Sequence, residues 1–230
     1  MRYCFLLLCA ALCSCASVSV KRSELLTPRA PARIPERILI KPPTFYDPGL
    51  RVDRSGLNLQ TFKYELQEKF TRNLVQRLSG HIAPAHAVAS TAPLPQGNYW
   101  MIATRFDGVN QGSRLLRSVV GFGAGGTKLN VSVVVYDLSK RKPRPFFLVE
   151  TTGGSNAMPG AVGSVAYLVT GFTALISAAN LFEGTRSGIS FDTIRTTHEV
   201  TAALSEFLYR QGALSPEKAI SPKRAKSEPL

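Results

Sequence analysis

The sequence predicts an α+β domain in which a small mixed or antiparallel β-sheet of about four to five strands is packed by two or three helices. Three segments carry this prediction. Asn58–Ser79 has apolar side chains at spacings of three and four, which is typical of an amphipathic helix. Lys128–Leu138 alternates apolar and polar side chains, which is typical of a half-buried strand. Asp192–Gln211 returns to the helical period after the strands.

Several strands are expected. Arg37–Tyr46 begins as a strand that Pro42 and Pro43 cut short, because proline cannot donate a hydrogen bond to a β-ladder. A further short strand is expected near Ala85–Ala89. The three longest expected strands are Tyr99–Asp107, Lys128–Leu138 and Pro145–Thr152, of which the last two form a hairpin through the basic turn Ser139–Lys142.

Three helices are expected, and they differ in their patterning. The first begins at Asn58, which caps it, and ends before Gly80. The second, Gly160–Phe182, is uncharged and rich in small residues. The third starts with Asp192 as its cap and extends to Gln211. Its predicted buried stripe contains Ile194, Val200, Leu204 and Leu208.

The composition is that of a folded and strongly basic protein. Of 230 residues, 44% are hydrophobic, which excludes a wholly disordered chain. Lys and Arg together number 28 against 15 Asp and Glu, so the formal net charge is +13. This charge favours anionic neighbours, such as lipid headgroups, anionic glycans, acidic proteins or nucleic acid. All cysteines lie before residue 16, which excludes a disulfide framework or a cysteine-based zinc site from the remainder.

Residues 1–15 resemble a bacterial signal peptide that ends in a lipobox. The apolar run Phe5–Leu12 is too short to span a bilayer. In the segment Leu12–Cys15, a leucine stands three residues before the last cysteine and a small residue directly before it, so Cys15 is the expected lipidation site. Cys9 and Cys13 do not fit, because each follows a leucine. The alternative is ordinary signal-peptide cleavage and secretion without a lipid.

The residue after the expected lipid bears on the membrane that holds it. Lipoproteins that stay in the inner membrane typically carry Asp there, and this chain has Ala16. By this resemblance we expect an outer-membrane lipoprotein that faces the periplasm, anchored by acyl chains such as palmitate. The remaining domain boundaries follow from composition. We expect a flexible tether at 16–36, a single α+β domain at 37–212 and a disordered basic tail at 213–230.

A glycine-rich segment precedes the strand that begins at Lys128. Gly121, Gly123 and Gly126 formally match a dinucleotide-binding fingerprint, but that fingerprint requires a helix after it, and a strand follows here. The segment is therefore interpreted as a bulged entry into a strand, where another backbone passes closely. Three basic side chains flank it and are candidates for contact with an anion or a partner: Arg114, Arg117 and Lys128.

No pattern in the sequence points to catalysis, a cofactor or a metal. His81 and His86 lie around a proline in an expected loop, and His198 lies on the last expected helix without a neighbouring cysteine or histidine motif. The carboxylates at the strand ends occur singly, as in turns: Asp47, Asp53, Asp107 and Asp137. We therefore expect a protein that is not an enzyme, with no catalytic, cofactor-binding or metal-binding residues.

The segment Thr151–Phe182 contains no charged residue and is long enough to span a bilayer. Its glycines and hydroxyl side chains give it only modest apolarity, and small residues allow close helix packing in membranes and in soluble proteins alike. Three interpretations stay open: a helix buried against the sheet, a segment that inserts into a membrane or an oligomer, and a mobile lid.

One stretch of the chain resembles a known family. Gly112–Arg114, Arg117, the glycines of 121–125, the alternating strand and Asp137 resemble the bacterial domain-of-unknown-function family forty-four ten. Its members are largely predicted envelope lipoproteins without an established activity, and the resemblance covers roughly residues 37–211. The turn Ser139–Arg144 departs from the short glycine turn of many members.

The expected function combines the signal sequence, the charge and this resemblance. We expect a lipid-anchored, periplasm-facing, non-enzymatic envelope protein that binds or supports an envelope protein or an anionic polymer. A nucleic-acid partner fits the charge but not the location. The alternative is a pore- or complex-forming accessory subunit whose segment 160–182 inserts into a membrane or an oligomer, and oligomers are possible in either case.

Overall fold

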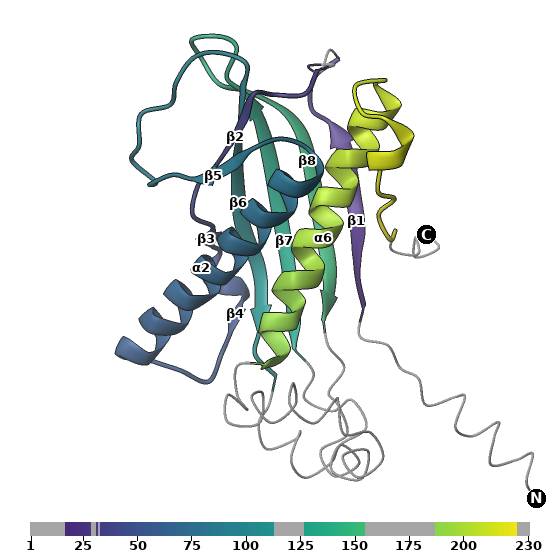
Figure 1. Cartoon of the computed structure of the whole chain (residues 1–230). Coiled ribbons are helices and arrows are strands. Elements are labelled where there is room, and N and C mark those ends of the chain that lie inside the picture. The colour runs from purple at the N-terminus through teal and green to yellow at the C-terminus, as the bar shows by residue number, and fades with distance from the viewer. Residues whose placement is uncertain (1–16, 29–30, 32, 113–126, 155–186, 225–230) are drawn as a thin grey trace, which may run out of the picture.

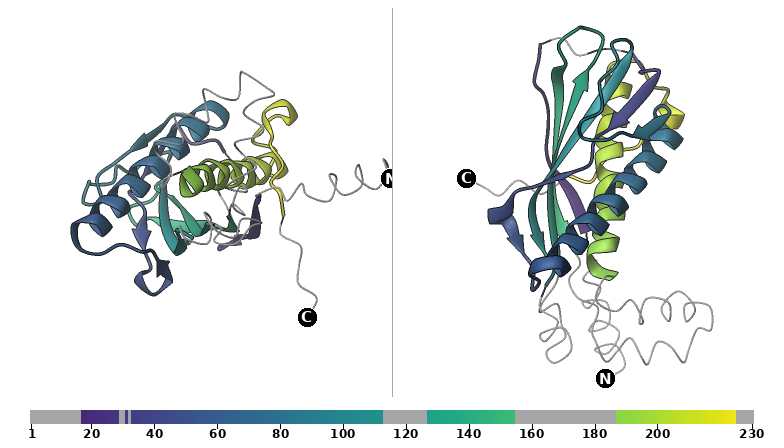
Figure 2. Two further views of the ribbon diagram at one scale, coloured as in Figure 1. Left: turned by 90° about the horizontal axis from the view of Figure 1, so that it is seen from below. Right: turned by 90° about the vertical axis from the view of Figure 1, so that its left-hand side faces the viewer.

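The computed structural model describes residues 17–28, 31, 33–112, 127–154 and 187–224 (Figure 1). The described residues form one β-sheet with two α-helices packed on the same face, as the side view shows (Figure 2). The predicted α+β class is confirmed. The sheet has eight strands, more than the four to five that the sequence predicts, because several strands are only two to four residues long.

The sheet is mixed, and its order is β1-β8-β7-β6-β2-β5. The four strands from β1 to β6 in this order pair antiparallel, whereas β2, β3 and β4 pair parallel with β6 and β5 pairs parallel with β2. The strands are β1 (Ser17–Leu25), β2 (Arg37–Ile40), β3 (Thr44–Phe45), β4 (Leu50–Arg51), β5 (Ala85–Ala87), β6 (Tyr99–Asn110), β7 (Lys128–Asp137) and β8 (Arg144–Gly154).

The three longest predicted strands are confirmed as β6, β7 and β8, and β7 and β8 form the predicted antiparallel hairpin. Alternation places one set of side chains on the helix-covered face. On β7 this set is Leu129, Val131, Val133 and Val135, all at most 1% exposed. In the turn after β7, the Asp137 carboxylate accepts a hydrogen bond from the backbone N–H of Ser139 at 3.0 Å, the turn-forming role expected of it.

Helix α2 (Gly56–His81) confirms the first predicted helix but not its ends. It begins two residues before Asn58, with Ser55 as the N-cap residue, and Gly80 lies inside it. The apolar spacing fixed the buried face, and end positions depend on local geometry that this spacing does not encode. The buried apolar residues recur every four positions: Phe62, Leu66, Phe70, Leu74 and Leu78.

Helix α6 (Ser187–Arg210) begins five residues before the predicted cap, Asp192. Asp192 is instead fully buried inside the helix, and its carboxylate accepts a hydrogen bond from the Thr127 hydroxyl at 2.6 Å. Ile194 is 40% exposed, whereas the other predicted stripe residues are buried. Ile194 stands six positions before Val200, which places the two side chains on different faces of a helix with about 3.6 residues per turn.

The predicted tether at 16–36 is wrong for its first half, because residues 17–25 form strand β1. β1 pairs antiparallel with β8 from Ser17 opposite Gly154 to Leu25 opposite Phe147. Val18 and Val20 are each 2% exposed and pack under α6. Two valines in a polar stretch are too weak a pattern to predict a strand. The strand forms because β8 provides its hydrogen-bonding partner.

The predicted disordered tail at 213–230 is wrong for residues 213–224. Leu214 is 5% exposed, and a 3-10 helix, η2, spans Pro216–Lys218. The Ile220 N–H donates to the Ser205 hydroxyl of α6 at 2.9 Å. The Lys223 carbonyl accepts a hydrogen bond from the Val20 N–H of β1 at 2.6 Å. The chain after α6 therefore returns along the helix to the first strand, and we call its residues 213–224 the C-terminal segment.

The core lies between the sheet and the two helices. Aromatic rings join the layers: Phe70 of α2 meets Phe106 of β6 edge-to-face at 5.3 Å between centroids, and Phe147 of β8 stacks on Phe207 of α6 at 4.8 Å. No helix in the described ranges is long and apolar enough to cross a membrane. The predicted helix Gly160–Phe182 and the glycine-rich segment 121–126 lie outside the described residues.

A glycine substitution tests the close packing of the loop before β4 on β6. A Cβ at Gly49 would lie 1.9 Å from the carbonyl oxygen of Asp107, so Gly49→Ala forces the backbone to shift. We expect Gly49→Ala to lower the free energy of unfolding by about 1–3 kcal/mol in urea denaturation. The control is Gly80→Ala in α2, where a Cβ meets no atom within 4 Å, and which should leave stability unchanged or raise it by roughly 0.5–1 kcal/mol. Equal effects of the two changes would contradict the packing.

Candidate functional site

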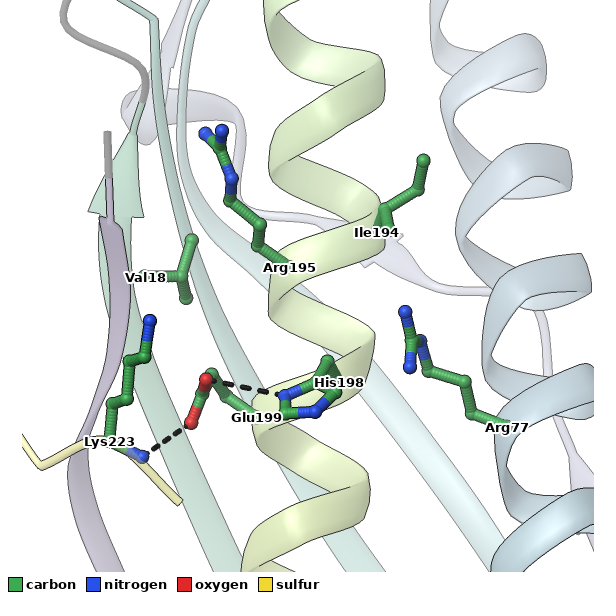
Figure 3. Close-up of a pocket in the computed structure, with 7 residues that line it drawn as sticks. All are labelled: Val18, Arg77, Ile194, Arg195, His198, Glu199 and Lys223. Carbon is green, nitrogen blue, oxygen red and sulfur yellow. Dashed lines mark hydrogen bonds and ion pairs between the residues drawn. The ribbon is translucent and has the colours of Figure 1, made fainter. Parts of the chain in front are cut away.

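A basic hollow opens where α6 lies between α2, strand β1 and the C-terminal segment (Figure 3). Its volume is about 190 Å³. We call this hollow the basic pocket. α2 contributes one side chain, α6 four, β1 one and the C-terminal segment one. The lining residues are Arg77, Ile194, Arg195, His198, Glu199, Val18 and Lys223.

Glu199 is the acidic residue of the basic pocket, and both of its oxygens are engaged. Its side chain is 5% exposed. Oε2 accepts a hydrogen bond from the backbone N–H of Lys223 at 2.6 Å, and Oε1 lies 3.4 Å from Nδ1 of His198 (Figure 3). Glu199 thereby fastens the C-terminal segment to α6 and places Lys223 at the rim of the pocket.

The cations of the basic pocket come from three separate elements. Arg195 lies 3.8 Å from a carboxylate oxygen of the buried Asp192, so it is already an ion-pair partner. Within the described part of the chain, no acidic side chain pairs with the Arg77 guanidinium or with the Lys223 ammonium. Three cations and Glu199 leave two net positive charges among the lining residues.

A run of buried hydroxyl side chains lets α6 pack closely beside the basic pocket. Thr197 and Thr201 donate to the carbonyls four residues earlier on the helix, at 2.9 and 2.8 Å. This pattern satisfies a buried hydroxyl within its own helix. Thr193 accepts a hydrogen bond from the side chain of Asn73 on α2 at 3.3 Å. The short side chains bring α6 and α2 together, so Arg77 of α2 reaches the same hollow as His198 of α6.

A second hollow of about 260 Å³ lies farther along α6, between the end of β1 and Arg224. Its charges are matched inside the protein. Glu206 forms ion pairs with Arg210 and with Arg224, and Glu24 pairs with Arg22 at 2.6 Å. With its charges already paired, this second hollow is a weaker candidate for an anion than the basic pocket.

The predicted site residues fall in different places. Cys15, Arg114 and Arg117 lie outside the described residues. Lys128 is exposed at the start of β7 and does not line the basic pocket. His81 and His86 are exposed, and His198 is the histidine that reaches the pocket. Across the described ranges, no group of three or more His, Cys, Asp or Glu side chains is placed to hold a metal ion.

Sequence reasoning missed the basic pocket. Its residues span positions 18 to 223 and match no motif. The one local signal is Arg195, His198 and Glu199 within two turns of one helix, a charge pattern that usually marks a solvated face. Only the packing of β1 and the C-terminal segment against α6 turns this helix face into a pocket.

Comparison with known proteins identifies the family. Residues 52–171, more than half of the chain, match the family model of a domain of unknown function, DUF4410. The chain belongs to the DUF4410 family. The match covers α2 and strands β5 to β8 of this DUF4410 protein, a shorter range than the 37–211 expected from the resemblance. Of the residues that line the basic pocket, Arg77 lies inside it.

Solved structures share the chain course only distantly. The PelC dodecamer from Paraburkholderia phytofirmans, in two crystal forms, is 12% and 11% identical to this DUF4410 protein. The matches cover 80% and 84% of this chain and 97% and 100% of PelC, with TM-scores of 0.38 and 0.37. A crystal structure of an uncharacterized protein matches 52% of this chain and 76% of its own at 16% identity and a TM-score of 0.23. No curated protein matches the chain.

Removing the Glu199 carboxylate tests how the pocket is held together. Glu199→Ala leaves the Lys223 N–H without its acceptor, so we expect residues 218–224 to open more often and their amides to exchange several-fold faster. We expect the free energy of opening this segment to fall by about 1.5–3 kcal/mol, the contribution of a hydrogen bond to a charged group. Glu217→Ala, an exposed carboxylate in the same segment, is the control and should not change exchange. Equal exchange rates in both variants would show that Glu199 does not hold the segment.

Proposed function

We propose that this DUF4410 protein is a lipid-anchored, periplasm-facing envelope protein that binds an acidic group of an envelope partner in the basic pocket and catalyses no reaction. The observation that carries the proposal is the pair of cations at the pocket, Arg77 and Lys223, which no acidic side chain of the described residues neutralises. A negatively charged ligand would provide the ion-pair partner for these two cations.

The size and chemistry of the basic pocket suit one acidic group. A hollow of about 190 Å³ has room for a carboxylate or phosphate group and a few attached atoms. The Arg77 guanidinium offers a planar fork of donors that matches either group, whereas the Lys223 ammonium acts as a mobile point charge. The same acidic chemistry is presented by acidic side chains of an envelope protein and by an anionic polymer.

The state of Glu199 supports binding rather than catalysis. Its two oxygens contact the Lys223 N–H and His198, so the carboxylate has a structural role: it holds the C-terminal segment against α6. The buried hydroxyls beside it donate back into their own helix. An arrangement of this kind fixes the shape of the pocket.

The proposed anchor is the acylated Cys15 of an outer-membrane lipoprotein. Mass spectrometry of the mature N-terminus should find Cys15 as the first residue, carrying acyl chains such as palmitate. Cys15→Ala should move the protein from the membrane fraction to the soluble periplasmic fraction, whereas Cys13→Ala should leave it membrane-bound. A mature chain that begins at Ala16 or Ser17 without a lipid would refute the anchor.

Photo-crosslinking from the basic pocket tests the proposed partner. A photoreactive phenylalanine at Ile194, which lines the pocket and is 40% exposed, should crosslink a partner in intact envelopes. Arg77→Glu should lower the yield at least several-fold, because it reverses a charge at the pocket. Arg72→Glu makes the same change on the same helix outside the pocket and should leave the yield unchanged.

Two polymer probes separate the sources of the acidic group. We expect polygalacturonate, a carboxylate polymer, or polyphosphate to compete with the crosslink if the partner is an anionic polymer. If the partner is a protein, the crosslinked product should instead be a discrete species that proteolysis removes. A crosslink yield that Arg77→Glu and Arg72→Glu lower equally would refute binding through the pocket.

A further inference from the structure

The start of β1 lies very near the proposed lipid, on which this inference rests. One residue, Ala16, separates Cys15 from Ser17, the first residue of β1. Two residues of fully extended chain span at most about 7 Å. The headgroup layer on one side of a bilayer is itself about 5–8 Å thick. With no tether before β1, Ser17 of a lipidated chain lies in or directly above the headgroups.

The pairing of the strands identifies the residues that share one end of the domain with Ser17. Ser17 pairs with Gly154 at the end of β8, and Lys128 at the start of β7 pairs with Asn110 at the end of β6. Arg51 of β4 also pairs with Asn110. We call the end defined by these five residues the anchor end. Figure 1 shows it at the lower side of the sheet, where α2 and α6 also begin.

The side chains at the anchor end suit a membrane surface. Arg51 and Lys128 are exposed cations, and Asp53, an exposed carboxylate, lies two residues after Arg51. Leu57, in the first turn of α2, is 85% exposed, and Phe191, in the first turns of α6, is 44% exposed. Exposed apolar side chains beside cations suit the boundary between anionic headgroups and acyl chains.

A basic turn at the opposite end of the domain also has the charge to bind an anionic membrane. Lys140, Arg141, Lys142 and Arg144 are all exposed there. β1 carries the chain away from the lipid over nine residues, and a strand rises about 3.3 Å per residue, so its far end is about 26 Å from its start. The turn reaches the leaflet only if the whole domain lies down on it. The short link to the lipid keeps the anchor end at the surface in every orientation.

We infer that the anchor end docks on the anionic headgroups of the leaflet that holds the lipid, through Arg51 and Lys128, and that the domain stands upright on it. In this orientation the basic turn Ser139–Arg144 points away from the membrane. The basic pocket opens beside α6 close to the anchor end, because Val18 directly follows Ser17 and Ile194 lies about one turn after Phe191. Both Val18 and Ile194 line the pocket in Figure 3.

Single-cysteine labels measure this orientation. A mature lipidated chain has no other free thiol, because Cys4, Cys9 and Cys13 precede the cleavage site and the sulfur of Cys15 carries the lipid. Leu57→Cys and Lys140→Cys therefore each accept one fluorophore, at opposite ends of the domain. The labelled full-length mature proteins are placed in vesicles of phosphatidylethanolamine and phosphatidylglycerol that contain a headgroup spin-labelled lipid.

We expect the label at position 57 to be quenched several-fold and the label at position 140 to keep its fluorescence. Equal quenching at both positions would mean that the domain lies flat, and it would overturn the inference. No quenching at position 57 in a chain that mass spectrometry shows to be lipidated would overturn it as well, while leaving the proposed anchor intact. An unlipidated chain would overturn both.

Two variants separate the short link from the charges. A Gly/Ser insertion of about ten residues between Ala16 and Ser17, which spans roughly 17 Å, should reduce quenching at position 57 several-fold. With the native link, Lys128→Glu should reduce quenching on vesicles with phosphatidylglycerol and leave it unchanged on phosphatidylcholine vesicles. Lys140→Glu is the matched control and should have no effect on either. Quenching that neither the insertion nor Lys128→Glu changes would contradict docking through this end.

Discussion

The antiparallel pairing of β1 with β8 is the interaction on which the rest of the structure depends. It adds an outer strand to the sheet, and α6 packs on β1 as well as on β7 and β8. Val18 of β1 then forms one wall of the basic pocket, and the Val20 N–H donates to the carbonyl of Lys223. Without β1, the C-terminal segment would lose the hydrogen bond from the Val20 N–H, and the pocket would lose its Val18 wall.

The parts of the fold that the sequence predicts are those with a strong local period. α2 repeats an apolar residue every four positions, and β7 alternates strictly, so both are recognised without knowledge of their neighbours. β1 and the C-terminal segment were expected to be unfolded because each buries few apolar side chains. Their structure depends on partners far away in the chain: Ser17 meets Gly154, and Lys223 meets both Val20 and Glu199.

The candidate site was less predictable than the fold for the same reason. A pocket built from residues 18, 77, 194–199 and 223 exists only after the chain has folded. Sequence reasoning searched for contiguous motifs and so selected the basic residues around the glycine-rich segment. Of these, Lys128 is described and lies at the anchor end. The charge excess of the whole chain favours anionic neighbours, but net charge carries no information about where cations gather.

In the proposed anion site, the buried Glu199 carboxylate is compatible with an acidic ligand. Glu199 would repel an acidic ligand if it faced the hollow alone. Its charge is instead shared with the Lys223 N–H and with His198, and the segment that it holds brings another cation to the rim. The Glu199 carboxylate thus helps to place the Lys223 cation at the rim of the pocket, where the proposed ligand would contact it.

If the proposed lipid anchor holds many copies on one leaflet, the two outer edges of the sheet determine whether those copies pair with one another. Unpaired strand edges invite pairing with another copy, and lipid anchors would hold copies side by side in a plane. β5 offers only three residues, too few for a stable added strand. β1 is longer, but it carries the charged Lys21, Arg22 and Glu24, and the C-terminal segment already pairs with it at Val20. Both edges are thus poor templates, so neighbouring copies resist joining their sheets.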